Sequence, residues 1–170
     1  MLILGLKRLE KEVCMNSILL DTSFCIRLLK QDDPLHQNAY QYFQYFLEKR
    51  IEMYLSTIVV SEYSVKDDIN NLPLQTLKII PFDFFDGKVA GEFYSILHNN
   101  KEQTQGLERL VIKDDCKLIA QIYNRKIDAY ITKDKKSFTQ FFNPIQKEMK
   151  FSIELLDLSI SLKEYKNELF

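Results

Sequence analysis

Four acidic residues stand at places in this sequence where carboxylates could act together. Asp21 directly follows an apolar run, Glu62 lies among valines in "STIVVSEYSV", and Asp134 follows the apolar stretch "AYIT". The fourth acid belongs to the pair Asp114–Asp115, at the opening of the apolar segment "CKLIAQI". Carboxylates brought close together repel one another and lose hydration, so such a group requires a compensating positive charge.

A divalent cation would resolve this conflict and bring a defined chemistry. Mg²⁺ and Mn²⁺ prefer oxygen ligands. One bound cation lowers the pKa of a coordinated water, and a second, roughly 3.5–4 Å away, also stabilises the leaving oxygen of a phosphodiester. The chain has only two histidines, which leaves little scope for zinc or for His-activated nucleophiles. Acids alone are sufficient for metal-dependent phosphodiester hydrolysis.

Each acid also has a purely structural interpretation. Asp21 and Asp115 could each cap a helix by accepting hydrogen bonds from free backbone N–H groups, and Asp114 could share that role. Asp134 lies in a lysine-rich stretch, where a solvated charge is common. Glu62 is the hardest to explain structurally, because an acid among valines of a helix occupies a buried or cleft-facing position. The joint pattern is more specific than any single member.

The elements that must position these acids alternate between short apolar segments and longer amphipathic ones. We predict strands over 17–20, 52–57, 77–82, 127–132 and 151–158. We predict helices over 23–30, 58–69, 84–100 and 112–126, another after Asp33 as N-cap with Pro34 as first helical residue, and a terminal helix in the last dozen residues. Residues 133–142 are expected to form a loop and a short helix.

This alternation predicts a parallel sheet with right-handed crossovers and helices on both faces. Ligands bind to such sheets outside the carboxyl ends of the strands. All four acids lie at strand ends or on first helical turns on that side. We therefore expect them to converge on one cleft.

Composition sets the remaining bounds. A length of 170 residues with 46% hydrophobic and 28% charged residues suits one globular domain, expected over residues 15–170, with residues 1–14 as an N-terminal extension or a mis-assigned start. The net charge of −1 does not indicate a strongly basic nucleic-acid binder. An odd count of three cysteines without metal-like spacing fits reduced thiols in the cytoplasm. No apolar run is long enough to span a membrane.

The chain resembles PIN domains, particularly the VapC-type toxin ribonucleases of toxin–antitoxin pairs. The motifs that carry the resemblance are "ILLDTS", "STIVVSEY", "KDDCKLIAQIYNRK" and "IDAYITKDKKSF", and the resemblance covers about residues 16–157. The residues after the third acid, Cys116 and Lys117, replace the usual small ones, and "NRK" replaces a common glycine turn.

The resemblance implies a three-layer α/β/α fold around a five-stranded parallel sheet. It also implies a Mg²⁺- or Mn²⁺-dependent endoribonuclease whose ligands fall on Asp21, Glu62, Asp115 and Asp134, with Asp115 preferred to Asp114. The positions expected to orient the acids or contact the RNA backbone are Thr22, Ser23, Thr132 and Lys133, with Lys135 and Lys136 nearby. An antitoxin partner and a homodimer are also implied.

Two other interpretations remain open. One is a non-catalytic PIN-like module that binds RNA or protein through the same fold. The other is a phosphoacceptor receiver domain, which also places acids at strand ends of a doubly wound sheet. A receiver would carry an acidic pair on the first strand, whereas Asp21 stands alone there, and it would leave Glu62 without a role.

Overall fold

A five-stranded sheet forms the centre of the computed structural model, which describes residues 15–100 and 109–168. The strand order is β3-β2-β1-β4-β5, and every neighbouring pair is parallel. The strands are β1 (Ser17–Leu20), β2 (Glu52–Ser56), β3 (Leu77–Ile80), β4 (Ala129–Thr132) and β5 (Glu154–Asp157). The predicted all-parallel sheet is confirmed, with most strands shorter than expected.

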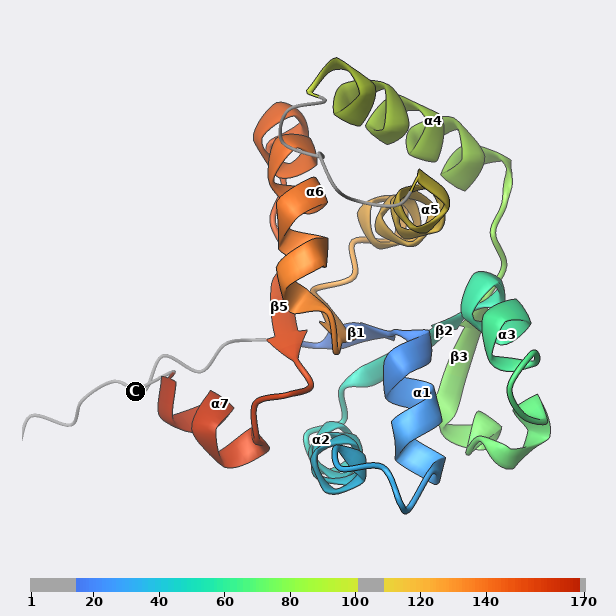
Figure 1. Ribbon diagram of the computed structural model, residues 1–170, viewed down its shortest axis with the longest axis vertical. Coiled ribbons are helices and arrows are strands. Elements are labelled where there is room, and N and C mark those ends of the chain that lie inside the picture. The colour runs from blue at the N-terminus through green and yellow to red at the C-terminus, as the bar shows by residue number, and fades with distance from the viewer. Residues whose placement is uncertain (1–14, 101–108, 169–170) are drawn as a thin grey trace, which may run out of the picture.

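The helices form a layer on each face of the sheet. The helices that follow β1 and β2 are α1 (Thr22–Leu29), α2 (His36–Glu48) and α3 (Thr57–Tyr63). Those that follow β3 and β4 are α4 (Phe84–Asn99), α5 (Arg109–Arg125) and α6 (Lys135–Met149), and α7 (Leu162–Glu168) follows β5. The chain moves outward from β1 in one direction, then returns and moves in the other, so right-handed crossovers place the two sets on opposite faces. Figure 1 shows α4, α5 and α6 above the sheet and α1, α2 and α7 below it.

Burial on both faces explains the nearly continuous apolar strands. Ile18, Leu19 and Leu20 of β1 are at most 1% exposed, and all four residues of β4 are buried. β1 and β4 therefore fix the positions of the residues that directly follow them in the chain. Asp21 follows β1, and Asp134 comes two residues after β4.

Asp128 aligns β1 and β4 at their amino ends. Its Oδ2 accepts hydrogen bonds from the backbone N–H groups of Asn16 (2.8 Å) and Ser17 (3.0 Å), and the Ser17 hydroxyl accepts one from the Asp128 N–H (3.0 Å). This register places Leu20 opposite Ile131. The carboxyl ends of the two strands therefore lie side by side.

A buried carboxylate ties α5 to the start of α4. Asp86 is fully buried and accepts hydrogen bonds from Arg125 (2.7 Å) and Asn124 (2.9 Å) of α5. It also forms a capping box with Asp83, which confirms the predicted helix start there. Gln121 donates to the Pro81 carbonyl oxygen (3.0 Å). These contacts fix the axis of the helix that carries Asp114 and Asp115.

Two helix boundaries differ from prediction because polar side chains close turns. The helix predicted from Asp33 and Pro34 begins at His36, because Asp33 accepts a hydrogen bond from the Leu35 N–H (2.9 Å) in a turn. The helix predicted over 58–69 ends at Tyr63. Asp68 then caps a separate short 3₁₀ segment, η1 (Ile69–Asn71).

Two further helices are longer than expected. α5 begins at Arg109 rather than residue 112, and the segment predicted as a loop and short helix forms α6 over 15 residues. α6 continues through Pro144, which is buried together with Ile145. Packing against the core therefore outweighs the cost of a proline inside a helix.

The predictions for residues 1–14, including Cys14, lie outside the described residues. Cys25 and Cys116 are free and buried, and burial raises the pKa of both thiols above the usual value, that of Cys116 to about 12. Within the described ranges, no helix is long and apolar enough to cross a membrane.

Candidate functional site

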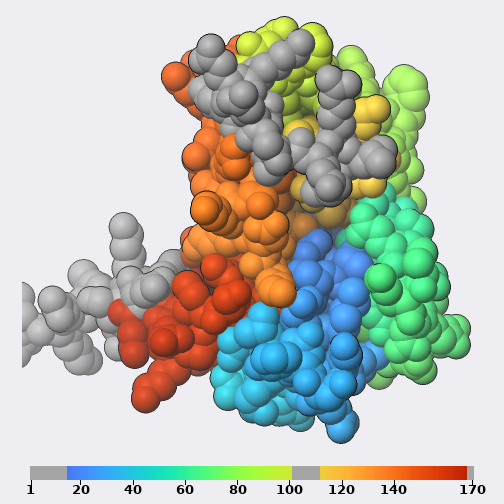
Figure 2. Space-filling view, in the orientation of Figure 1, coloured from blue at the N-terminus to red at the C-terminus, as the bar shows by residue number. Residues whose placement is uncertain are grey.

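A pocket of about 310 Å³ lies at the carboxyl edge of the sheet, where the strand order reverses between β1 and β4. Ligands of doubly wound sheets bind at such a switch point. The lining residues are Asp21, Glu62, Asp114, Asp115, Tyr130, Thr132, Asp134, Ser137 and Phe138. The structure thus brings together all four acids predicted to converge. In the space-filling view, the blue atoms of α1 lie between the green atoms of the α3 region and the orange atoms of α6 (Figure 2).

Asp21 is both a helix cap and part of the pocket. Its Oδ2 accepts hydrogen bonds from the Ser23 N–H (3.2 Å), the Ser23 hydroxyl and the Thr132 hydroxyl (3.0 Å). Its Oδ1 accepts one from the Tyr130 hydroxyl (2.8 Å). The capping interpretation is therefore correct, but it does not exclude a role in the pocket.

Glu62 reaches the pocket from the last turn of α3. It is half-buried, and its Oε2 accepts a hydrogen bond from the Thr22 hydroxyl. Burial raises the pKa of its carboxyl, the hydrogen bond from Thr22 opposes that shift, and the negative charges of Asp21 and Asp114 add to it. Thr22 thus orients the acid of a neighbouring helix.

Asp115 lies inside α5 rather than at its start, so its interpretation as a helix cap is wrong. Burial, followed by the negative charges of Asp21, Glu62, Asp114 and Asp134, raises the pKa of Asp115 to about 8. Among the described residues, none donates a hydrogen bond to its carboxylate or forms an ion pair with it. Asp115 is therefore the acid of this pocket most in need of a positive charge.

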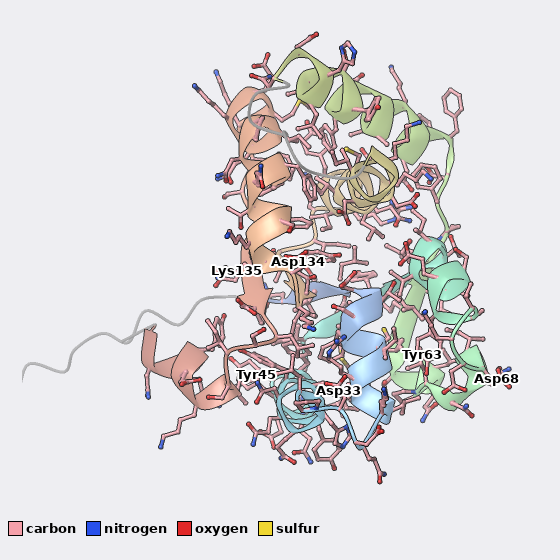
Figure 3. All side chains as sticks on the ribbon, viewed as in Figure 1. Asp33, Tyr45, Tyr63, Asp68, Asp134 and Lys135 are labelled. Carbon is pink, nitrogen blue, oxygen red and sulfur yellow. The ribbon has the colours of Figure 1, made fainter. Side chains whose placement is uncertain are left out.

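Asp114 and Asp134 stand at the outer part of the pocket. Asp114 forms an ion pair with Lys117 (2.7 Å) and is about half exposed. Asp134 is exposed and caps α6, since its Oδ1 accepts a hydrogen bond from the Ser137 N–H (3.2 Å). Figure 3 shows Asp134 where α6 begins, next to Lys135.

Ser23, Thr132 and Lys133 connect the loops after β1 and β4. The Ser23 hydroxyl accepts a hydrogen bond from the Lys133 N–H (3.0 Å), and the Thr132 hydroxyl accepts one from the Asp134 N–H (3.2 Å). Both hydroxyls also donate to Asp21. Lys133 contributes its backbone to this network, while the residue as a whole is exposed.

Tyr130 and Phe138 line the pocket but were not among the predicted site residues. Strand alternation could have identified Tyr130, because residues 130 and 132 of one strand point to the same face. Sequence patterns alone give no such signal for Phe138, which enters the pocket from the first turns of α6.

The carboxylate oxygens that line this pocket suit a hard cation, although the described side chains are not arranged as a complete set of metal ligands. Every acid of the pocket offers carboxylate oxygens, and the partly buried carboxylate of Asp115 has no positive partner among the described residues. Within residues 15–100 and 109–168, no group of three or more His, Cys, Asp or Glu side chains is arranged to hold a metal ion. Asp21, Glu62, Asp114 and Asp134 instead accept hydrogen bonds from neighbouring groups. Oxygen chemistry and location fit Mg²⁺ or Mn²⁺, and ligation would require Glu62 and Asp134 to turn toward Asp21 and Asp115.

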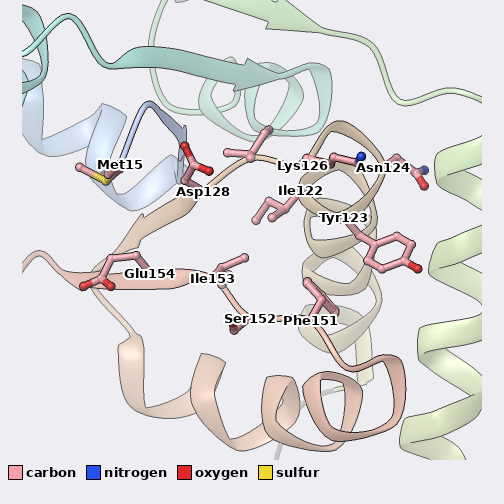
Figure 4. A pocket seen from close by; sticks show the side chains of 11 residues that line it. Met15, Ile122, Tyr123, Asn124, Lys126, Asp128, Phe151, Ser152, Ile153 and Glu154 are labelled. Atoms are coloured by element: carbon pink, nitrogen blue, oxygen red, sulfur yellow. The ribbon is translucent and has the colours of Figure 1, made fainter. Parts of the chain in front are cut away.

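A larger pocket, of about 750 Å³, lies at the opposite, amino edge of the sheet (Figure 4). Met15, Asp128 and Glu154 line it together with Tyr123 and Phe151 of an aromatic cluster. The Asp128 carboxylate is bound to the start of β1. The grouped acids therefore make the smaller pocket the candidate site.

Comparison with solved structures shows what this fold is similar to. A chain in the crystal structure of VapBC2 from Rickettsia felis, bound to a DNA fragment from their promoter, matches with a TM-score of 0.57 at 17% identity over 83% of this chain and 98% of that one. A chain of DNA-bound VapBC from Salmonella typhimurium gives a TM-score of 0.55 at 17% identity over 85% and 99%. A chain of VapBC-1 from nontypeable Haemophilus influenzae gives 0.50 at 14% identity over 85% and 99%.

In sequence, neither a family model nor a curated protein matches the chain. The structural likeness covers nearly the whole of the solved chains. The fold of this protein is therefore that of the matched chains in these VapBC complexes, and the α/β fold that the resemblance to VapC-type PIN domains implied is confirmed.

Proposed function

We propose that this protein is a metal-dependent endoribonuclease that hydrolyses RNA phosphodiester bonds and acts as the toxin of a toxin–antitoxin pair. One observation carries the proposal. Acids from the end of β1, from α3, from α5 and from the start of α6 line one pocket at the switch point of the sheet. A merely structural set of caps and surface charges would have no reason to gather around a partly buried carboxylate.

Asp21, Glu62 and Asp115 are the residues that would hold a Mg²⁺ or Mn²⁺ ion, with Asp134 completing the set. When bound, the cation would supply charge neutralisation and activate water for attack on phosphorus. Ser23, Thr132 and Thr22 fix the orientation of two of these acids through their hydroxyls. Lys133, Lys135 and Lys136 are placed next to Asp134 to hold the RNA backbone by charge.

The proposed partners are RNA, an antitoxin protein and a second copy of the chain. The solved structures that share the fold are VapBC complexes, which supports an antitoxin partner. Single-stranded or looped RNA is the expected substrate form, because its bases are not paired and its backbone is accessible.

A homodimer is the expected oligomeric state of the isolated protein. The aromatic run of α2 is mostly core, since Tyr42 and Phe46 are fully buried, but Tyr40 and Leu47 are each 44% exposed. These two side chains leave apolar surface on α2 that a second copy could cover. Light scattering of the purified chain should give twice the mass of one chain, and a monomer at tens of micromolar would contradict this.

The receiver-domain interpretation does not fit the observed topology. Receivers have the strand order 2-1-3-4-5, whereas this sheet has the order β3-β2-β1-β4-β5. The non-catalytic PIN-like module keeps the fold and differs only in its chemistry. It would bind RNA without metal-dependent cleavage.

Metal-dependent cleavage tests the proposal directly. The protein is purified free of any partner, stripped of metal, and incubated with structured RNAs with and without Mn²⁺. Because a bound cation contributes several kcal/mol to phosphodiester cleavage, we expect Mn²⁺ to accelerate the reaction about a thousandfold and chelation to reverse this.

Asp157→Asn is the matched control for Asp-to-Asn changes at the acids of the pocket in this assay. Asp157 also ends a strand at the carboxyl edge, but its carboxylate accepts a hydrogen bond from the Ser159 N–H (2.8 Å) and it does not line the acidic pocket. The variant should cleave as the wild type does. RNA binding without any Mn²⁺-dependent cleavage would favour the non-catalytic module instead.

A further inference from the structure

Tyr130 places a hydroxyl group at the buried side of the acidic pocket. The residue is only 1% exposed, and its hydroxyl donates a hydrogen bond to Asp21 Oδ1 (2.8 Å). Among the described residues, Tyr130 is the one donor to that oxygen, whereas Ser23 and Thr132 donate to Oδ2. Donors on both oxygens fix the plane of the Asp21 carboxylate.

The tyrosine ring is itself held in place. It packs against Phe138 with ring centroids 4.7 Å apart, and Phe138 belongs to the helix that Asp134 caps. Tyr130 and Thr132 extend from the same face of β4 to opposite oxygens of one carboxylate. The strand therefore presents two rigid donors to Asp21, one of which the motif-based interpretation did not include.

We propose that Tyr130 is a positioning residue for Asp21 as a ligand of a divalent cation, an inference that rests on the proposed function. A carboxylate oxygen has two lone pairs, so the hydrogen bond from Tyr130 leaves one lone pair of Oδ1 for a cation. Side chains that hydrogen-bond to metal ligands set the orientation of those ligands, and their loss weakens metal affinity by about 10- to 100-fold.

A simpler explanation is that a buried tyrosine hydroxyl needs an acceptor and Asp21 supplies one. The two explanations differ in what the hydroxyl does for the metal. If it only satisfies the tyrosine, its removal changes stability and leaves metal affinity intact. If it positions Asp21, its removal weakens metal binding, and saturating metal restores cleavage.

The test compares Tyr130→Phe with Tyr42→Phe and the wild type. Tyr42 is also fully buried, and its hydroxyl donates to the Ile160 carbonyl oxygen (3.1 Å) away from the pocket, so Tyr42→Phe makes the same chemical change elsewhere. Mn²⁺ affinity is measured by calorimetry, and RNA cleavage is measured across a Mn²⁺ titration. We expect Tyr130→Phe to bind Mn²⁺ about 10- to 100-fold more weakly and to approach wild-type cleavage at saturating Mn²⁺. Tyr42→Phe should match the wild type in both measurements.

Three outcomes would overturn the proposal, and they bear differently on the nuclease activity. Equal Mn²⁺ affinity of Tyr130→Phe and wild type would remove the role of Tyr130 and leave the nuclease intact. A cleavage defect of Tyr130→Phe that saturating Mn²⁺ does not reduce would also remove the positioning role of Tyr130 and leave the nuclease proposal intact. A wild type that binds no Mn²⁺ would overturn the metal site and the role of Tyr130 together.

Discussion

Replacing Asp115 by Asn is expected to lower RNA cleavage about a thousandfold while making the metal-free protein more stable at pH 8. Asp115 is a partly buried acid of the pocket, and loss of hydration together with four neighbouring acids raises its pKa to about 8. Asparagine keeps the shape and removes the charge, so the repulsion and the cost of burying a charge disappear. Loss of a cation ligand worth several kcal/mol to the reaction lowers cleavage about a thousandfold.

The pH dependence of stability follows from the same raised pKa. A carboxyl whose folded-state pKa lies above its unfolded value of 3.8 takes up a proton more readily when folded. That proton uptake stabilises the fold fully below pH 3.8, and the stabilisation is lost as the pH rises toward 8. The contribution of Asp115 therefore makes the metal-free wild type less stable at pH 8 than at pH 6. Burial raises the pKa of Glu62 as well, so Glu62 contributes in the same direction.

Urea unfolding of the metal-free proteins at pH 6 and pH 8 measures this effect. At pH 8, Asp115→Asn should exceed the wild type by roughly 4–6 kcal/mol in free energy of unfolding, because folding raises the pKa of Asp115 from 3.8 to about 8 and each unit of pKa difference corresponds to about 1.4 kcal/mol. At pH 6 this difference should fall to about half, because Asp115 is then protonated in the folded state but still ionised in the unfolded chain. Mn²⁺ should then stabilise the wild type at pH 8 and leave the variant unchanged. A variant less stable than the wild type at pH 8 would mean that Asp115 has a stabilising partner.

Replacing Asp21 by Asn is expected to lower cleavage as strongly but to have the opposite effect on stability. The Asp21 carboxylate accepts hydrogen bonds from Tyr130, Ser23 and Thr132, which approach both of its oxygens. Asparagine has only one acceptor oxygen, and its NH₂ group would face donors on the other side. The variant should therefore lose about 1–2 kcal/mol of unfolding free energy.

The stability comparison for Asp21→Asn belongs at pH 6, where Asp115 is largely protonated and the loss of one negative charge brings little relief. Cleavage with Mn²⁺ should fall about a thousandfold, as for Asp115→Asn. Cleavage at the wild-type rate by Asp21→Asn would refute the assignment of the pocket as the active site. Equal stability of Asp21→Asn and wild type at pH 6 would instead show that the hydrogen bonds to Asp21 are weak.

The sequence was sufficient to predict the sheet, because strands buried on both faces need continuous apolar runs. "SILL" and "AYIT" are both recognisable as strands of that kind, and each forms a central strand of the sheet. Helix ends were harder to predict. Asp33 resembles a helix cap, yet it closes a turn, and α6 passes through Pro144 because its apolar face is buried. The course of α6 depends on packing between segments distant in the chain, whereas the turn at Asp33 is held by a local hydrogen bond from Leu35.

The four candidate acids were predicted from the sequence because each was expected to follow a strand or to lie near the start of a helix on one side of the sheet. Their individual environments were not. Asp115 appeared to be a cap at a helix start, but α5 begins at Arg109, so Asp115 lies within that helix and within reach of four other acids. Tyr130 gained its partner only because the register of β4 against β1 places its hydroxyl beside Asp21. Local sequence thus determined which residues are available for chemistry, whereas charge repulsion, burial and hydrogen-bond partners arise between segments and were decided only by the tertiary structure.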